Sequence, residues 1–134
     1  MKEAINTLST THSQVVFYGE IFGRKVQKLD YGLKGYGYGI FDILIDGNYV
    51  APGSLDTLCT TLGLEMVPYL GIVPFSMDNI KRLASGPAFS GSHVREGVVV
   101  RPLEERYDPK IGRVVLKYIS DEYLYGLKED FTDV

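Results

Sequence analysis

The sequence has few of the residues that form disulfides or histidine metal sites. Its 134 residues include one cysteine, Cys59, and two histidines, His12 and His93. One cysteine excludes an internal disulfide framework and is typical of a reducing compartment, so we expect a cytoplasmic protein. Cys59 lies among leucines and threonines in 55–62, where we expect a small buried apolar group rather than a nucleophile. The two histidines are too few and too far apart for a histidine-rich metal site.

Long apolar runs and an excess of basic charge are also lacking. No apolar run approaches the about 20 residues that cross a bilayer. Residues 1–13 are polar and lack the apolar centre of a signal peptide. The net charge is −3, so any contact with nucleic acid would depend on a local patch. With 45% hydrophobic and 23% charged residues and no repeat, the composition predicts a single soluble globular domain over 1–134.

The most informative feature that is present is charge within two apolar strands. The strands expected at 95–101 and 112–120 are rich in valine and isoleucine but contain Glu96, Arg101 and Lys117. Alternation would place Glu96 on the face of Val98, and Arg101 on the opposite face. A charge among apolar neighbours loses several kcal/mol of hydration unless a partner replaces the water. One such charge alone is typical of an edge strand that avoids aggregation, whereas three together favour a polar ligand site.

Hydrophobic periodicity and turn residues predict the remaining elements. A helix is expected at 2–10, strands at 14–22 and 24–29, and a hairpin at Asp46-Gly47 between strands 36–45 and 48–50. Further expected elements are a helix capped by Ser54 and Gly63, a strand at 64–69, a helix opened by Ser76, a loop at 85–92, a turn at 107–110 and a helix opened by Ser120. These elements predict an α+β fold of mainly antiparallel sheet with flanking helices.

Four segments in order resemble the motifs of one family. Residues 18–23 (Tyr-Gly-Glu-Ile-Phe-Gly) resemble its glycine-glutamate segment, 37–43 (Gly-Tyr-Gly-Ile-Phe-Asp-Ile) its motif III, 95–101 its motif IV and 115–119 its motif V. The family is the ATP-dependent RNA ligases of the covalent nucleotidyltransferase superfamily. The resemblance spans about residues 14–125 and implies an ATP-grasp-like nucleotidyltransferase (ligase adenylation) domain. The single domain would then be similar to the carboxy-terminal part of an RNA ligase adenylyltransferase domain.

The resemblance implies roles for several residues in binding ATP. Phe41 would stack on adenine, although it could equally be a core residue like Ile43. Asp42 would also belong to the ATP site, and a carboxylate among apolar neighbours needs a partner. Glu20 would bond the ribose or support a metal-bound water.

Three charged residues would act on the phosphate side of the site. Glu96 would help to hold Mg²⁺, which needs only a few carboxylates besides water. Lys117 would contact the phosphate and stabilise the charge that develops there, so Glu96 and Lys117 are the predicted catalytic residues. Arg101 would face either the phosphate of a nucleic acid, here RNA, or the nucleotide.

One family motif has no match in these residues. The family reacts through a lysine in a Lys-x-Asp-Gly motif I, and the similar run Lys28-Leu29-Asp30-Tyr31-Gly32 is one residue too long and follows Glu20. Motif V carries Ile119 where a second lysine is frequent. A truncated gene or fragment, a split enzyme and a stand-alone derivative would each explain this pattern.

Two functions therefore remain open. The chain would bind ATP or AMP and RNA, and join RNA ends only if the motif I lysine is supplied elsewhere. Alternatively, it is a non-catalytic nucleotide- or RNA-binding or assembly module that reuses the fold. A missing strand would leave a sheet edge and an apolar face uncovered, so we expect self-association or a complementing chain that carries motif I.

Overall fold

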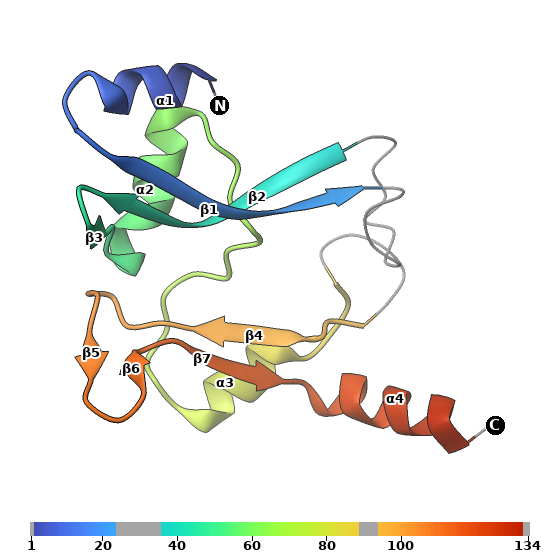
Figure 1. Cartoon of the computed structure of the whole chain (residues 1–134). Coiled ribbons are helices and arrows are strands. Elements are labelled where there is room, and N and C mark those ends of the chain that lie inside the picture. Colours follow the sequence, from blue (N-terminus) through green and yellow to red (C-terminus); the bar gives the residue numbers. More distant parts are fainter. Residues whose placement is uncertain (1, 24–35, 89–93, 133–134) are drawn as a thin grey trace.

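The protein consists of two small lobes joined by an extended segment (Figure 1). A computed structural model describes residues 2–23, 36–88 and 94–132. The amino-terminal lobe contains α1 (Lys2–Ser9), β1 (Val15–Gly23), β2 (Tyr36–Ile45), β3 (Asn48–Tyr49) and α2 (Pro52–Leu62). The carboxy-terminal lobe contains α3 (Met77–Ala84), β4 (Gly97–Val100), β5 (Tyr107–Asp108), β6 (Gly112–Arg113), β7 (Leu116–Ile119) and α4 (Asp121–Thr132).

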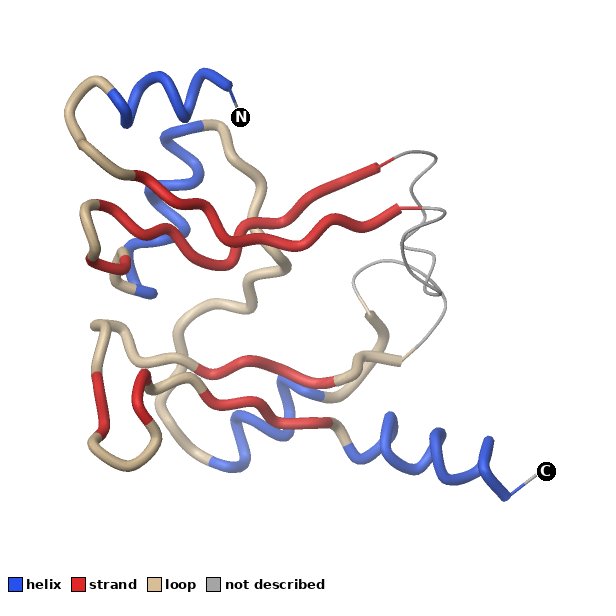
Figure 2. The backbone as a smooth tube through the Cα atoms, viewed as in Figure 1, coloured by secondary structure: helices blue, strands red, loops and turns tan. Residues whose placement is uncertain are grey.

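A long antiparallel pair forms the centre of the amino-terminal lobe. Strands β1 and β2 pair from Val15 opposite Ile45 to Gly23 opposite Tyr36. Asp46 and Gly47 both have positive φ, 48° and 84°, as a tight hairpin turn requires, and this confirms the hairpin predicted there. The core of the lobe joins this sheet to α1 and α2 (Figure 2) and consists of Ala4, Ile40, Ile43, Leu55, Cys59 and Leu64.

A short antiparallel pair forms the centre of the carboxy-terminal lobe. Strands β4 and β7 pair from Gly97 opposite Ile119 to Val100 opposite Leu116, and β5 pairs with β6 in a separate hairpin. Helix α3 packs on the first pair through the buried residues Ile80 and Ala84. The described residues confirm the predicted α+β fold dominated by antiparallel pairing. None of their helices is long and apolar enough to cross a membrane.

The predicted helices all form, but one begins at a different residue. Ser76 caps α3 by accepting a hydrogen bond from the Asn79 amide, and the Ser120 hydroxyl accepts from the Tyr123 amide at the start of α4. Gly63 ends α2 with φ of 69°, as predicted. The cap of α2 is Ala51 rather than Ser54. Pro52 provides the first helical residue because its ring presets φ and it has no amide hydrogen to satisfy.

Several predicted strands are shorter than expected. The strand expected at 64–69 is reduced to one bridge between Met66 and Ile40, and Pro68 cannot donate a ladder hydrogen bond. The strand expected at 112–120 is divided into β6 and β7, because the chain changes partner from β5 to β4 between them. The strand expected at 24–29 lies outside the described residues, as does part of the loop expected at 85–92.

Candidate functional site

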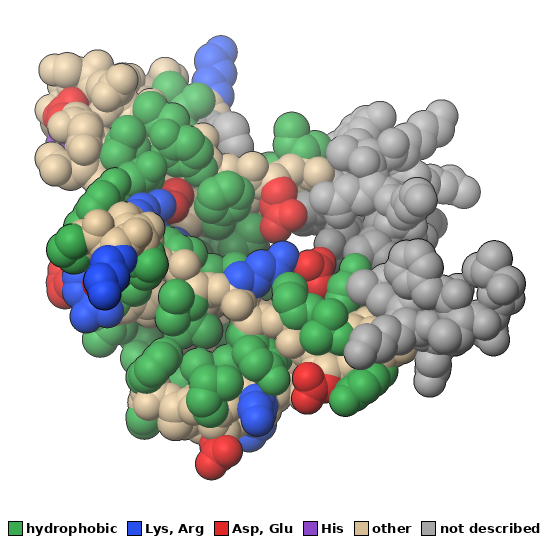
Figure 3. Space-filling view, turned by 60° about the horizontal axis from the view of Figure 1, so that its bottom comes forward, with side chains coloured by type: hydrophobic (Ala, Val, Ile, Leu, Met, Phe, Trp, Pro, Cys, Tyr) green, Lys and Arg blue, Asp and Glu red, His purple; other side chains and the backbone are tan. Residues whose placement is uncertain are grey.

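A large cleft lies between the two lobes. Its volume is about 1240 Å³, and most of its lining side chains are apolar. Its lining includes residues of β1 and β2, of β4 and α3, and of the extended segment 66–75. Basic and acidic side chains lie together beside a hollow on the face shown in Figure 3. The cleft therefore combines an apolar interior with a few charged groups, as small-molecule sites generally do.

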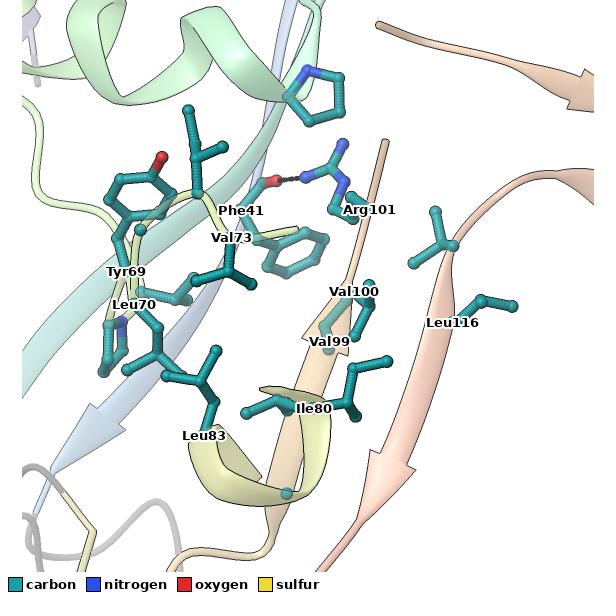
Figure 4. A pocket seen from close by; sticks show the side chains of 18 of the residues that line it. Phe41, Tyr69, Leu70, Val73, Ile80, Leu83, Val99, Val100, Arg101 and Leu116 are labelled. Atoms are coloured by element: carbon teal, nitrogen blue, oxygen red, sulfur yellow. Dashed lines mark hydrogen bonds between the residues drawn. The ribbon is translucent and has the colours of Figure 1, made fainter. Parts of the chain in front are cut away.

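A β-bulge turns Phe41 out of the core and into this cleft. Tyr18 pairs with Asp42 but the next residue, Gly19, pairs with Ile40, so Phe41 is the extra residue of β2. Bulges locally interrupt alternation and re-aim a side chain. Accordingly Ile43 is 0% exposed, whereas Phe41 is 41% exposed and lines the cleft. Figure 4 shows the Phe41 ring between Val73 and strand β4.

Asp42 is buried behind Phe41, in contact with a group of half-buried charges. We call Asp42, Arg101, Glu105 and Arg113 the ionic cluster. Asp42 is 5% exposed and accepts from Arg101 Nη2 at 2.8 Å and from Arg113 Nη1 and Nη2 at 2.6 and 2.9 Å. Arg113 also binds Glu105 and lies 3.5 Å from the centre of the Tyr49 ring. The carboxylate that lacked a partner in the sequence is thus held by two guanidinium groups.

Contacts within the ionic cluster shift the pKa values of Asp42 and Arg113. Burial raises the pKa of the Asp42 carboxyl, but hydrogen bonds from Arg113 and Arg101 outweigh it, so the pKa lies below its ordinary value. The hydrogen bonds to Asp42 and Glu105 raise the pKa of the Arg113 guanidinium. Both shifts favour the charged forms of Asp42 and Arg113 at neutral pH.

Glu96 and Lys117 form a second, more exposed ion pair. Lys117 Nζ donates to Glu96 Oε1 at 2.9 Å, with the two side chains 58% and 48% exposed. This hydrogen bond raises the pKa of the Lys117 ammonium. Alternation predicted Glu96 on the face of Val98, but β4 begins only at Gly97, and the carboxylate reaches Lys117, which lies opposite Val99. The ladder continues one step beyond β4, because the Ser120 amide donates to the Glu96 carbonyl at 2.8 Å.

The predicted site residues are therefore only partly gathered at the cleft. Glu20, Phe41, Glu96 and Arg101 line it, whereas Asp42 lies behind Phe41 and Lys117 is not among the lining residues. Glu105 and Arg113, which flank the turn predicted at 107–110, are not among the site residues predicted from the sequence. Asp42 itself indicated that a cationic partner was needed, because a buried carboxylate needs a cation.

The cleft offers carboxylates to a metal without forming a complete cage. Glu20 and Glu96 both line it, but the described residues contain no group of three or more histidine, cysteine, aspartate or glutamate side chains able to hold an ion. Mg²⁺ commonly binds through one or two carboxylates together with water and phosphate oxygens. These residues fit a metal that arrives with a phosphorylated ligand.

Solved structures of one RNA ligase resemble this chain over nearly its whole length. A lysine-to-alanine variant of the Naegleria gruberi RNA ligase with ATP and manganese is 27% identical, with a TM-score of 0.72 over 96% of this chain and 38% of the ligase. A lysine-to-methionine variant with AMP and manganese gives the same values. The ligase with PPi is 25% identical, with a TM-score of 0.65 over 94% of this chain and 40% of the ligase.

The chain thus spans about two fifths of the length of these ligases. No curated protein matches it. A family model described as RNA ligase matches residues 1–119. This match covers most of the 134 residues and agrees with the structural likeness. The chain belongs to the RNA ligase family.

Proposed function

We propose that this chain forms the nucleotide-binding walls of an ATP-dependent RNA ligase and binds ATP or AMP, with Mg²⁺, in the cleft between its lobes. One observation carries the proposal: the bulge at Phe41 exposes an aromatic ring inside a mostly apolar cleft that also contains Glu20 and Glu96. The similar ligases with ATP or AMP and manganese support it. RNA is the proposed second substrate.

The base and ribose would bind at the wall made by β1 and β2. Phe41 would stack on adenine, an interaction worth about 1–3 kcal/mol per base. Glu20 lies on β1, antiparallel to β2, and opposite Gly39. Its carboxylate would accept a hydrogen bond from the ribose. The Phe41 ring and the Glu20 carboxylate would thus bind the nucleoside from neighbouring strands of one sheet.

The phosphates would bind near the start of β4. Glu96 would hold the cation together with phosphate oxygens, and the cation would supply charge neutralisation at the phosphates. Lys117 is paired with Glu96 in the ligand-free chain. If Glu96 held a cation, this pair would be released, and the Lys117 ammonium would approach a phosphate oxygen and stabilise its charge.

Joining RNA ends would further require the lysine nucleophile of motif I. The 134 residues contain no Lys-x-Asp-Gly segment, so we propose that another chain or segment supplies it. The same absence favours the second candidate, a non-catalytic module that binds nucleotide or RNA. Both candidates share the nucleotide cleft and differ in covalent chemistry.

Binding of ATP tests the cleft. With Mg²⁺ present, Phe41→Ala should weaken the affinity for ATP by about 5- to 150-fold, the equivalent of one lost base stack. Tyr107→Ala is the matched control, because Tyr107 is 75% exposed on β5 and outside the cleft lining. Isothermal titration calorimetry measures both. No ATP binding by the unaltered chain, or equal losses in the two variants, would contradict the proposal.

Covalent labelling distinguishes the two candidates. The chain is incubated with ATP labelled in its adenylate and with Mg²⁺, then denatured and examined for label on protein. We expect ATP binding without label. A lysine-linked adenylate on this chain would show that it contains the nucleophile and would exclude the non-catalytic module. Adding a chain that carries motif I should produce label on that chain if the split-ligase proposal holds.

A further inference from the structure

The bulge that exposes the Phe41 ring also leaves Phe41 without an opposite residue in β1. Carbonyl groups at a bulge need another hydrogen-bond partner when they face the interior. Arg101 Nη1 donates to the Phe41 carbonyl oxygen at 2.7 Å (Figure 4), and Arg101 Nη2 donates to Asp42 at 2.8 Å. One guanidinium group therefore holds two consecutive residues of the bulge.

Arg101 is itself placed by both lobes. It directly follows β4, whose other end adjoins Glu96. Asp42, which orients its guanidinium, is held on its second oxygen by Arg113. A second link between the lobes lies nearby, where the Gly53 amide donates to the Leu103 carbonyl at 2.9 Å. The guanidinium thus joins the strand that carries the aromatic ring to the strand that follows the acidic residue Glu96.

We propose that Arg101 is a positioning residue that sets the Phe41 ring at the correct distance from Glu96 and Lys117, so that one nucleotide spans both. This inference rests on the proposed function of the cleft. It assigns Arg101 a different role from a contact with RNA phosphate. A planar fork with two parallel donors can hold a carbonyl and a carboxylate together, which a lysine ammonium at that position cannot do with the same geometry.

The charges of the ionic cluster support this role. Asp42 and Glu105 balance Arg101 and Arg113, two acids against two bases, so the cluster has no net charge to attract a polyanion. The Arg101 side chain is only 16% exposed. A move to an RNA phosphate would break its bonds to Phe41 and Asp42, and a buried bonded charge is costly to release.

Comparing ATP with a ligand that has no base separates positioning from general damage. Arg101→Lys should weaken ATP binding about tenfold and leave binding of inorganic tripolyphosphate within about twofold, because only the link between base and phosphate sites is lost. The combination with Phe41→Ala should add little beyond Phe41→Ala alone. Arg82→Lys is the control, since Arg82 is exposed on α3 and donates to Asn79 of its own helix.

Two measurements need no bound ligand. In the unaltered chain the Nη protons of Arg101 should exchange slowly with solvent, and the carbonyl ¹³C resonance of Phe41 should shift in Arg101→Lys but not in Arg82→Lys. Rapid exchange in the unaltered chain would overturn the positioning role even if the variant fails to fold. Failure of the unaltered chain to bind ATP and tripolyphosphate would instead contradict the proposed function.

Titration with RNA tests the alternative role of Arg101, a contact with RNA phosphate. If Arg101→Lys weakens binding of single-stranded RNA and leaves ATP binding unchanged, Arg101 contacts RNA phosphate and the positioning role is wrong. Equal losses for ATP and tripolyphosphate would also overturn it, because they would show a general loss of the cleft. We expect RNA binding within about twofold of the unaltered chain.

Discussion

Phe41 shows how one extra residue changes the chemistry of a strand. Regular alternation would place its ring with Ile43 in the core, and the bulge places it in the cleft instead. Close approach of the strands accompanies the bulge: a Cβ on Gly19 would lie 2.6 Å from the Gly39 carbonyl oxygen. A side chain at 19 would force the strands apart at the bulge, so this glycine supports the exposure of the Phe41 ring.

The lowered pKa of Asp42 predicts a specific dependence of stability on pH. Because the folded pKa lies below the ordinary value of 3.8, the carboxylate contributes stability that is present above about pH 4 and is lost as pH falls through the folded pKa. Asp42→Asn should cost about 3–5 kcal/mol at pH 7, since it leaves Arg101 and Arg113 without their shared anion. Urea unfolding at pH 7 and pH 3 measures both effects. The difference in free energy of unfolding between the unaltered chain and Asp42→Asn should be smaller at pH 3 than at pH 7. An unchanged difference would contradict this account.

The exposed ion pair of Glu96 and Lys117 should matter little for stability and more for ATP binding. Surface ion pairs contribute about 0–1 kcal/mol, and Glu96 and Lys117 are both about half exposed. Glu96→Ala and Lys117→Ala should therefore leave the melting temperature nearly unchanged but weaken ATP binding in the presence of Mg²⁺. Calorimetry and thermal unfolding measure the two quantities. Unfolding of both variants would show that the pair is structural.

At the scale of elements, strand pairing decides where the charged residues are presented. The pair β4 and β7 is only four residues long in each strand and holds Glu96 at one end and Arg101 at the other. Its close approach depends on Gly97, where an added Cβ would lie 1.9 Å from the Tyr118 carbonyl oxygen and 2.9 Å from Ile119 Cα. Backbone atoms cannot yield as a flexible side chain can, so the strands themselves would have to separate.

Gly97→Ala should destabilise the protein by at least about 2 kcal/mol and weaken ATP binding, because it separates β4 from β7. Gly126→Ala provides a matched control. Gly126 lies within α4, and an added Cβ there has no atom within 4 Å apart from the neighbouring residues and the backbone of its own helix. This second substitution should be neutral or stabilise by up to about 1 kcal/mol. Chemical unfolding measures both, and equal stabilities would show that the strands tolerate the added methyl group.

In the molecule as a whole, several large apolar side chains of the cleft are exposed to solvent. Phe75, Ile72 and Val99 line it and are 74%, 63% and 60% exposed. Contiguous apolar surface on a small protein is typical of a binding interface or of a self-association site.

We predict concentration-dependent self-association of the chain through this apolar wall. Phe75→Ser and Ile72→Ser together should lower it, because they remove exposed apolar area without touching the core. Tyr107→Ser removes a ring of similar exposure outside the cleft and serves as the control. Sedimentation velocity over a range of concentrations measures the effect. A purely monomeric chain, or equal effects of the two changes, would contradict the prediction.

Most turns and helix ends, and the family, could be predicted from the residues alone. Turn and cap residues predicted the hairpin at Asp46-Gly47 and the ends of most helices, because these signals act over a few residues. The order of four motifs indicated the RNA ligases, and the match over residues 1–119 confirms that family. The individual roles of the predicted site residues stay predictions.

The pairing of the charged residues depends on contacts between segments far apart in the chain. Asp42 meets Arg101 across 59 residues of sequence and Arg113 across 71. No periodic pattern selects these partners among the 14 lysines and arginines of the chain. The bulge at Phe41 likewise depends on the register between two strands. The chain's local preferences set which elements form, but burial of Asp42 between the lobes requires guanidinium partners that only the folded chain brings together.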